Sequence, residues 1–262
     1  MLTDRTSVLR ACPHTLALIH PDGEAPANVI PWLDSDAPFP RLDSALVQPN
    51  GLLAAGADLS PARLVYAYRH GIFPWYSEGQ PILWWSPDPR MVLYVPEFKP
   101  SRSLTRRIRR RDYEVRIDTA FDAVIEACAS APREEQNGTW ISGEMVRAYR
   151  RLHALRYAHS VEAWREGELV GGLYGLALGK VFFGESMFAR ATDASKVCLA
   201  ALVALLQHRG VALIDCQQET RHLASLGARP ISRRQFARHL RELIDSNAVP
   251  AGWTAGQVSE SR

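Results

Sequence analysis

The polar residues that end an apolar segment are the first candidates for chemistry in this sequence. Asp215, Cys216 and Gln217 follow the apolar run 211–214. Alternation along a strand predicts that Asp215 and Gln217 share one face and that Cys216 lies on the other. Burying a carboxylate without partners is costly, and functional sites collect at the ends of strands in α/β proteins. We therefore favour a functional role for Asp215 over a cap of the next segment.

An acidic residue also interrupts the very apolar segment Val181–Phe188. Alternation predicts that Glu185 and Met187 share a face of this strand. Acidic side chains are seldom buried without a specific partner, and a cationic group of a substrate would be such a partner for Glu185. Met187 and the phenylalanines around it would equally serve as ordinary core residues.

The segment Lys99–Arg111 is dominated by arginine and contains Ser101, a good helix N-cap. At 3.6 residues per turn, the apolar Leu104 and Ile108 lie on one face of this helix. Four arginines lie on the opposite face: Arg102, Arg106, Arg109 and Arg110. Like charges at this spacing repel unless an anion offsets them, and a nucleic-acid phosphate backbone is such an anion. A solvated basic face is the alternative that the pattern leaves open.

Aromatic residues gather in three loop segments, 71–76, 84–90 and 139–141. Rigid prolines beside tryptophans suit a flat surface on which a nucleobase stacks. The same residues would suit packing between domains, and we favour packing for Trp84 and Trp85.

Composition restricts the class of protein. A hydrophobic content of 47% is that of a globular chain, and a net charge of +3 does not by itself indicate a nucleic-acid ligand. No CxxC, HxxxH or HExxH pattern and no glycine-rich phosphate loop occurs, so we expect reduced cysteines, no metal and no small cofactor. Without a membrane-spanning run or a signal-peptide pattern, the expected location is the cytoplasm, with no membrane partner.

These candidate residues need an α/β fold with a mixed sheet to position them. We expect an N-terminal extension over residues 1–30, a small domain over 31–90 made mostly of loops, a catalytic domain over 91–247 and a mobile tail over 248–262. Ser60, Pro61 and Gly71 delimit one helix in the small domain. The larger domain is predicted to hold an antiparallel meander, with strands at 159–165, 169–178 and 180–188. We also expect strands at 91–95, 113–117 and 211–217, a helix opened by Ser101, and helices at 119–129, 142–155, 194–208 and 232–244.

Eleven segments together resemble the bacterial leucyl/phenylalanyl-tRNA–protein transferase family. They lie in order along roughly residues 39–240 and include Pro-Asn-Gly-Leu-Leu-Ala-Ala-Gly at 49–56, Gly-Ile-Phe-Pro-Trp at 71–75, Ile-Leu-Trp-Trp-Ser-Pro-Asp-Pro-Arg at 82–90, Gly-Glu-Ser-Met-Phe at 184–188 and Ile-Asp-Cys-Gln at 214–217. The resemblance implies a small N-terminal domain packed on a domain with the fold of the Gcn5-related N-acetyltransferases. It also implies transfer of Leu or Phe, and less well Met, from its tRNA to proteins with N-terminal Arg or Lys, which marks them for degradation.

The resemblance also implies roles for individual residues. Trp75 and Trp140 resemble the surface that holds the terminal adenosine of the tRNA. The apolar pocket for the aminoacyl side chain would consist of Leu173, Phe182, Met187, Leu199, Leu202 and Ile214. Asp215 and Gln217 match residues assigned to the peptide amine, with Glu185 beside them, and the four arginines fall on the tRNA-binding cluster. Ala189 departs from the family pattern, where serine is common, and puts one hydroxyl of the site in doubt.

The mechanism that we expect is aminolysis of the aminoacyl ester. Asp215, acting with Gln217, would orient the amine and help to deprotonate it, and Glu185 would favour a cationic N-terminal residue. The ribose of the tRNA could share the proton transfer. A coenzyme A-dependent N-acetyltransferase and a non-catalytic RNA-binding protein are the alternatives. The turn 189–194 lacks the glycines that hold pyrophosphate, which disfavours the former. We expect a monomer.

Overall fold

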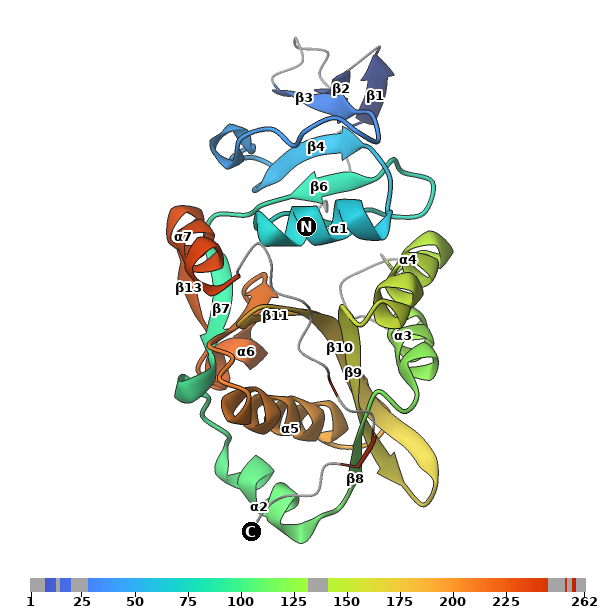
Figure 1. Ribbon diagram of the computed structural model, residues 1–262, viewed down its shortest axis with the longest axis vertical. Helices are drawn as coiled ribbons and strands as arrows, with labels where there is room; N and C mark the ends of the chain where they lie inside the picture. The colour runs from blue at the N-terminus through green and yellow to red at the C-terminus, as the bar shows by residue number, and fades with distance from the viewer. Residues whose placement is uncertain are drawn as a thin grey trace.

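The computed structural model describes residues 8–12, 15–19, 28–131, 141–244, 253 and 256–257. Within them the chain forms a small sheet and a large sheet, with helix α1 (Pro61–Arg69) between the small sheet and the larger domain (Figure 1). No helix in this part of the chain is long and apolar enough to cross a membrane. The predicted α/β class with a mixed sheet is confirmed.

The small sheet has the strand order β1-β2-β3-β4-β6-β5. Its strands are β1 (Val8–Cys12), β2 (Thr15–Ile19), β3 (Asn28–Leu33), β4 (Leu52–Gly56), β5 (Phe73–Pro74) and β6 (Leu83–Trp85), with the 3-10 helix η1 (Leu42–Ser44) between β3 and β4. The prediction that residues 1–30 form only a loose extension is therefore wrong for β1, β2 and the start of β3. Alternation there is short and interrupted by proline, and pairing between strands supplies what the local sequence does not signal.

Helix α1 begins and ends as its sequence predicts. The Ser60 hydroxyl accepts a hydrogen bond from the backbone N–H of Arg63, and Pro61 occupies the first helical position. Gly71 follows the helix with a φ of 77°. A Cβ at Gly71 would lie 3.3 Å from the side chains of Phe236 and Leu240, so glycine serves both the turn and the close approach of the C-terminal helix.

The large sheet has the order β13-β7-β12-β11-β10-β9-β8-β14 among the described residues. Its strands are β7 (Arg90–Tyr94), β8 (Glu114–Ile117), β9 (Ala158–Arg165), β10 (Glu168–Leu178), β11 (Val181–Ala189), β12 (Leu213–Gln217), β13 (Arg229–Ile231) and β14 (Gly256–Gln257). The predicted antiparallel meander is β9-β10-β11. Strand β12 returns parallel to β11, and this one parallel pair among the described strands of the large sheet makes the sheet mixed, since β12 pairs antiparallel with β7.

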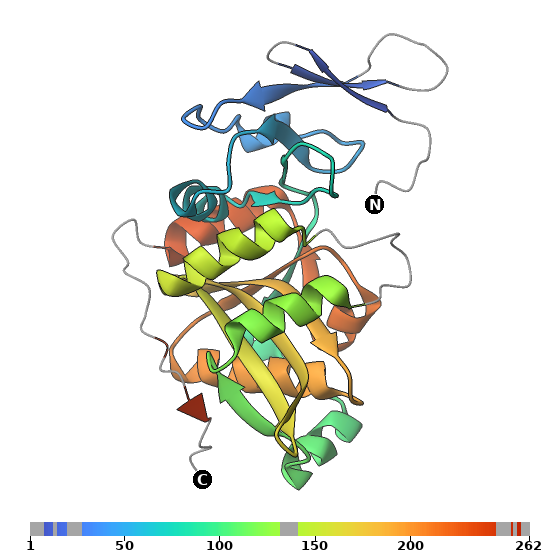
Figure 2. The same cartoon turned by 90° about the vertical axis from the view of Figure 1, so that its right-hand side faces the viewer.

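Helices cover both faces of the large sheet (Figures 1 and 2). They are α2 (Arg102–Arg110), α3 (Phe121–Ser130), α4 (Gly143–Ala154), α5 (Ala194–His208), α6 (Arg221–Ser225) and α7 (Arg233–Leu243), with the 3-10 helix η2 (Val95–Glu97) after β7. Alternation along β10 shows the two faces. Leu173 packs with Leu199 and Leu202 of α5 in an apolar cluster, the α5-side cluster. The next residue, Tyr174, packs on the other face against Phe121 of α3 and Tyr149 of α4. The cluster on the α3 and α4 side continues into the small domain through Tyr68 of α1.

The C-terminal segment differs from the predicted mobile tail. Trp253 is 2% exposed, and its ring stacks on that of His159 with centroids 4.2 Å apart. Strand β14 pairs with β8. The prediction of a mobile tail is therefore wrong at Trp253 and β14, because burial of the Trp253 ring and pairing of β14 with β8 stabilise these residues.

Candidate active site

A buried carboxylate in the middle of β11 is the centre of the candidate site. Glu185 accepts hydrogen bonds from the hydroxyls of Tyr68 and Tyr149 at 2.7 and 2.9 Å. The Gln217 Nε2 donates to Glu185 Oε1 at 3.0 Å, and the two tyrosine hydroxyls bond to each other. Glu185 keeps 9% of its surface exposed. The small domain, α4 and two strands thus contribute one side chain each to a single polar cluster.

A β-bulge directs Glu185 into this cluster. The register of β10 against β11 shifts between Tyr174 and Gly175, which leaves Glu185 without a partner in the ladder. Met187, beyond the bulge, packs against the apolar cluster on the α5 side, whereas Glu185 meets side chains of α1 and α4. The prediction that Glu185 and Met187 share a face is therefore wrong, because the extra residue reverses the alternation between them.

Asp215 lies next to this cluster in a separate, fully buried ion pair. Arg90 donates from Nε to Asp215 Oδ1 at 2.8 Å and from Nη2 to Oδ2 at 2.6 Å, and the side chains are 1% and 0% exposed. The guanidinium of Arg90 lies over the rings of Phe73 and Phe236. The backbone N–H of Gln217 also donates to Asp215 Oδ1. Asp215 therefore holds Arg90 and the end of β12 in place, and its carboxylate does not reach an open surface.

Gln217 connects the two carboxylates. The pairing of β12 with β7 shifts between Asp215 and Gln217, and Gln217 has a φ of 60°. In this conformation its backbone bonds to Asp215 while its side chain bonds to Glu185. The predicted side for Cys216 is confirmed, since Cys216 packs against the α5-side cluster. A Gln217 amide whose Nε2 donates to Glu185 presents Oε1 as an acceptor.

The pKa of the Glu185 carboxyl group is raised to near neutral pH. Burial raises its pKa to about 7, the nearby charge of Asp215 adds to this effect, and the two tyrosine hydroxyls and Arg90 oppose it. Burial and the Glu185 charge raise the pKa values of Tyr68 and Tyr149 well above 10, so both phenols stay protonated. A carboxyl group that titrates near pH 7 is suited to accept a proton from an amine and release it again.

The residues expected to form the aminoacyl pocket are brought together on the other face of the sheet. Leu173, Phe182, Leu199, Leu202 and Ile214 are all buried in the α5-side cluster, and Met187 is partly buried against it. The sequence did not indicate Trp253 as a neighbour of this set. The ring of Trp253 lies 5.6 Å from that of Phe182, between centroids.

The described tryptophans of these loops lie in or beside the core of the small domain. Trp84 is 0% exposed and donates its indole N–H to the Gly56 carbonyl, and Trp85 donates to the carbonyl of Trp75. Both therefore serve packing. Trp75 is half-buried and meets Trp85 edge to face at 5.5 Å between centroids. Trp140 lies outside the described residues.

Helix α2 has the two faces predicted for it. Leu104 is buried and Ile108 packs on the α5-side cluster, while Arg102, Arg106, Arg109 and Arg110 lie on the outer side. Asp112 pairs with Arg110 at 3.4 Å. Arg107, on the side of the helix, pairs with Asp112 and Asp193, so it does not belong to this outer stripe.

Sequence reasoning missed Arg90, Tyr68 and Tyr149. A buried aspartate requires a partner such as a buried cation, so Asp215 predicted a basic partner, but nothing in the sequence identified it as Arg90. The tyrosines gave no signal, because residues 81 positions apart meet only through packing of the small domain on α4. Among the described residues, no group of three or more His, Cys, Asp and Glu side chains could hold a metal ion.

The larger domain thus combines a mixed sheet, a buried carboxyl group whose pKa is raised to about 7 and a helix with a basic face. Comparison with known proteins identifies the family of transferases to which the chain belongs. The profile described as leucyl/phenylalanyl-tRNA protein transferase matches residues 92–241, and the profile of that family's N-terminal domain matches residues 57–88. The chain belongs to the leucyl/phenylalanyl-tRNA protein transferase family.

Individual relatives agree with this assignment. The leucyl/phenylalanyl-tRNA–protein transferase of Bordetella petrii is 59% identical over 238 residues, which cover 87% of this chain and 93% of that protein. The enzyme of the same name from Nitrosomonas europaea is 60% identical over 222 residues, covering 85% and 92%. Among solved structures, the chain is similar to a GCN5-related N-acetyltransferase from Kribbella flavida, with a TM-score of 0.36, 11% identity and 87% of each chain covered.

Proposed function

We propose that this protein transfers an aminoacyl group from aminoacyl-tRNA to the N-terminus of an acceptor protein, with Glu185 and Gln217 acting on the attacking amine. Family membership supports the reaction. The observation that carries the site assignment is the hydrogen bond between the Gln217 amide and the Glu185 carboxylate, whose pKa is raised to about 7.

The chemistry is aminolysis of an activated ester. The α-amino nitrogen attacks the ester carbonyl carbon, an amide bond forms, and the bond from that carbon to the ribose oxygen breaks. An α-ammonium group has a pKa of about 7.7–8.0, so a base of pKa near 7 removes its proton with a small uphill step. Glu185 takes that proton, and Gln217 Oε1 accepts a hydrogen bond from the amine. The second proton that the nitrogen loses as the amide forms passes to the departing ribose oxygen, which ends as a hydroxyl.

Asp215 has a positioning role in this scheme. Its two oxygens are held by Arg90, and it receives the Gln217 backbone N–H. This fixes the left-handed backbone at Gln217 from which the amide reaches Glu185. The direct contact with the amine that the sequence suggested for Asp215 therefore passes to Glu185 and Gln217.

The apolar cluster on the α5 side of the sheet is proposed as the wall of the aminoacyl pocket. A γ-branched or flat side chain, that of Leu or Phe, would fit against Phe182, Leu202 and Ile214, whereas a β-branched one would clash near its Cβ. One methylene changes binding by only about 1–3 kcal/mol, so some transfer of Met follows. Trp75 and Trp140 would stack on the terminal adenosine.

The outer arginines of α2 are proposed to bind the tRNA backbone. Four basic side chains on one face match a row of phosphates, and the apolar face fixes the helix to the domain. For the acceptor we propose N-terminal Arg or Lys, which a carboxylate at Glu185 would favour. Attachment of Leu or Phe would mark the acceptor for degradation in the cytoplasm, and we propose that the enzyme acts there as a monomer.

An acetyltransferase that uses coenzyme A is disfavoured by the N-terminus of α5. Asp193 occupies the N-cap position with a φ of 61° and pairs with Lys196 and Arg107. A carboxylate at the point where a helix would receive a pyrophosphate repels that anion. A purely RNA-binding role leaves the contact between Glu185 and Gln217 without a purpose.

The test uses purified protein, radiolabelled Leu-tRNA and two peptides that differ only in an N-terminal Arg or Ala. Label on the Arg peptide alone supports both the reaction and the acceptor rule. Equal label on both peptides would refute the acceptor rule, and tRNA binding without transfer to either would refute the enzymatic proposal. Ile-tRNA and Val-tRNA in place of Leu-tRNA test the pocket, which predicts little transfer from either.

A further inference from the structure

A second row of arginines lies on α7, outside the site described above. Arg234, Arg238 and Arg241 follow one another at spacings of four and three residues along this helix. Phe236 and Leu240, on the opposite side of the helix, are buried against the body of the protein. The helix therefore presents a cationic face, bordered by the exposed Glu242, whose direction is fixed by its apolar face.

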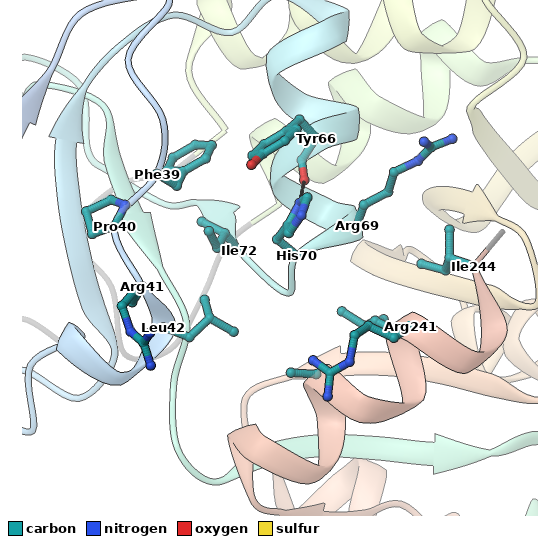
Figure 3. A pocket seen from close by; sticks show the side chains of 12 residues that line it. Phe39, Pro40, Arg41, Leu42, Tyr66, Arg69, His70, Ile72, Arg241 and Ile244 are labelled. Atoms are coloured by element: carbon teal, nitrogen blue, oxygen red, sulfur yellow. Dashed lines mark hydrogen bonds between the residues drawn. The ribbon is translucent and has the colours of Figure 1, made fainter. Parts of the chain in front are cut away.

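This cationic face borders a groove of about 890 Å³ between the small domain and α7. The groove runs between the segment 39–42, the end of α1 and α7, and Figure 3 shows Arg41, Arg69 and Arg241 around it. No acidic side chain is among the described residues that line it. Arg41 is paired with Asp43, whereas no ion pair joins Arg238 or Arg241 to a described residue.

Aromatic rings form one wall of the groove. Tyr66 stacks on His70 with centroids 4.1 Å apart, and Phe39 lies 6.1 Å from Tyr66 at 13° between ring planes. Tyr66 remains 46% exposed. Arginines beside stacked, partly exposed rings combine the two interactions that single-stranded nucleic acids use, namely charge on the backbone and stacking of the bases.

We propose that the groove and the arginine row of α7 bind the phosphate backbone of RNA, as a second contact surface for the aminoacyl-tRNA donor. The proposal rests on the donor assigned under the proposed function. The surface is separate from α2, because α2 lies at the far end of the larger domain from α1 and α7 in both views (Figures 1 and 2). Two separated basic surfaces would hold an extended polyanion in one orientation while its aminoacyl end reaches Glu185.

The test measures binding of fluorescently labelled tRNA to the full chain by anisotropy between 50 and 200 mM salt. The variant Arg238→Glu/Arg241→Glu is compared with Arg156→Glu/Arg165→Glu, which makes the same change in net charge at two exposed arginines that do not line the groove. The expected result is affinity about 10-fold or more lower for the α7 variant. The slope of log affinity against log salt should also be smaller by about two, since each phosphate that is no longer neutralised reduces it by about one.

The control variant should bind within about twofold of the wild type. Arg238→Gln/Arg241→Gln removes the charges without reversing them, and it should show the same change in slope with a smaller decrease in affinity. Equal affinities and slopes for the α7 and control variants would overturn the proposal, as would unchanged tRNA binding with a raised KM for an acidic acceptor protein. Failure of the wild type to bind tRNA would instead refute the proposed donor.

Discussion

Replacing Glu185 with glutamine should remove activity and at the same time stabilise the protein above neutral pH. The three hydrogen bonds among Glu185, Tyr68 and Tyr149 need three protons, and an ionised carboxylate with two phenols supplies only two. Glutamine restores the third, because its Nε2 donates to the Tyr149 oxygen while its Oε1 still accepts from Tyr68 and Gln217. The substitution preserves shape and takes away the charge.

The magnitude follows from the pKa of Glu185, which burial raises from 4.5 to about 7. Below pH 4.5 the carboxyl group is protonated in the folded and the unfolded chain. As the pH rises from 4.5 to 7, only the unfolded chain releases the proton, so the free energy of unfolding falls. One pKa unit corresponds to about 1.4 kcal/mol. Roughly 2 to 3 kcal/mol of stability is therefore lost between pH 5 and pH 8 in the wild type and kept in the variant.

Urea unfolding of both proteins at pH 5 and pH 8 measures this difference. Glu162→Gln is the matched control, because Glu162 is also buried, at 0% exposed, but receives four donors, from Thr119, Ala120 and Ser160. A glutamine amide there would place its own NH₂ group against these donors. The Glu162→Gln substitution should therefore lower the free energy of unfolding by roughly 1–3 kcal/mol at both pH values.

Single-turnover transfer supplies the second measurement. General-base catalysis contributes about 10² to 10⁴ in rate, so Glu185→Gln should lower the rate by that factor. The wild-type rate should rise with an ionisation near pH 7 that is missing from the variant. Near-normal transfer by Glu185→Gln, or a difference in unfolding free energy that does not change between pH 5 and pH 8, would refute the reasoning.

Three further predictions concern the surroundings of the site. Arg90→Met leaves Asp215 buried without its cation and should lower the free energy of unfolding by about 3–5 kcal/mol in urea titrations at pH 7; a decrease below about 1 kcal/mol would contradict the ion pair. Trp253→Ala should cost about 3–5 kcal/mol by the same measurement, and a change near zero would restore the prediction of a mobile tail. Arg106→Gln/Arg109→Gln should reduce the salt slope of tRNA binding by about two, and an unchanged slope would leave α2 as a merely solvated basic face.

Much of the larger domain could be predicted because its signals are local. The meander, α5 and the Ser101 cap depend on hydrophobic period, β-branched content and capping residues, which act within a few positions of the chain, as does the Ser60 cap in the small domain. The strands at the start of the chain and the anchor at Trp253 depend on partners outside their own segments. Nothing in their local composition reports those partners.

The sequence by itself determined that Glu185, Asp215 and Gln217 are unusual, since each is a polar residue at the end or middle of an apolar strand, and its motifs determined the family. Only the tertiary structure decided which side chains surround them. A bulge turned Glu185 toward two tyrosines from other elements, and a buried arginine took up both oxygens of Asp215. The physical reason is that the proton affinity of a carboxylate depends on burial and on neighbouring charges and donors. Those neighbours are set by packing between segments that are distant along the chain.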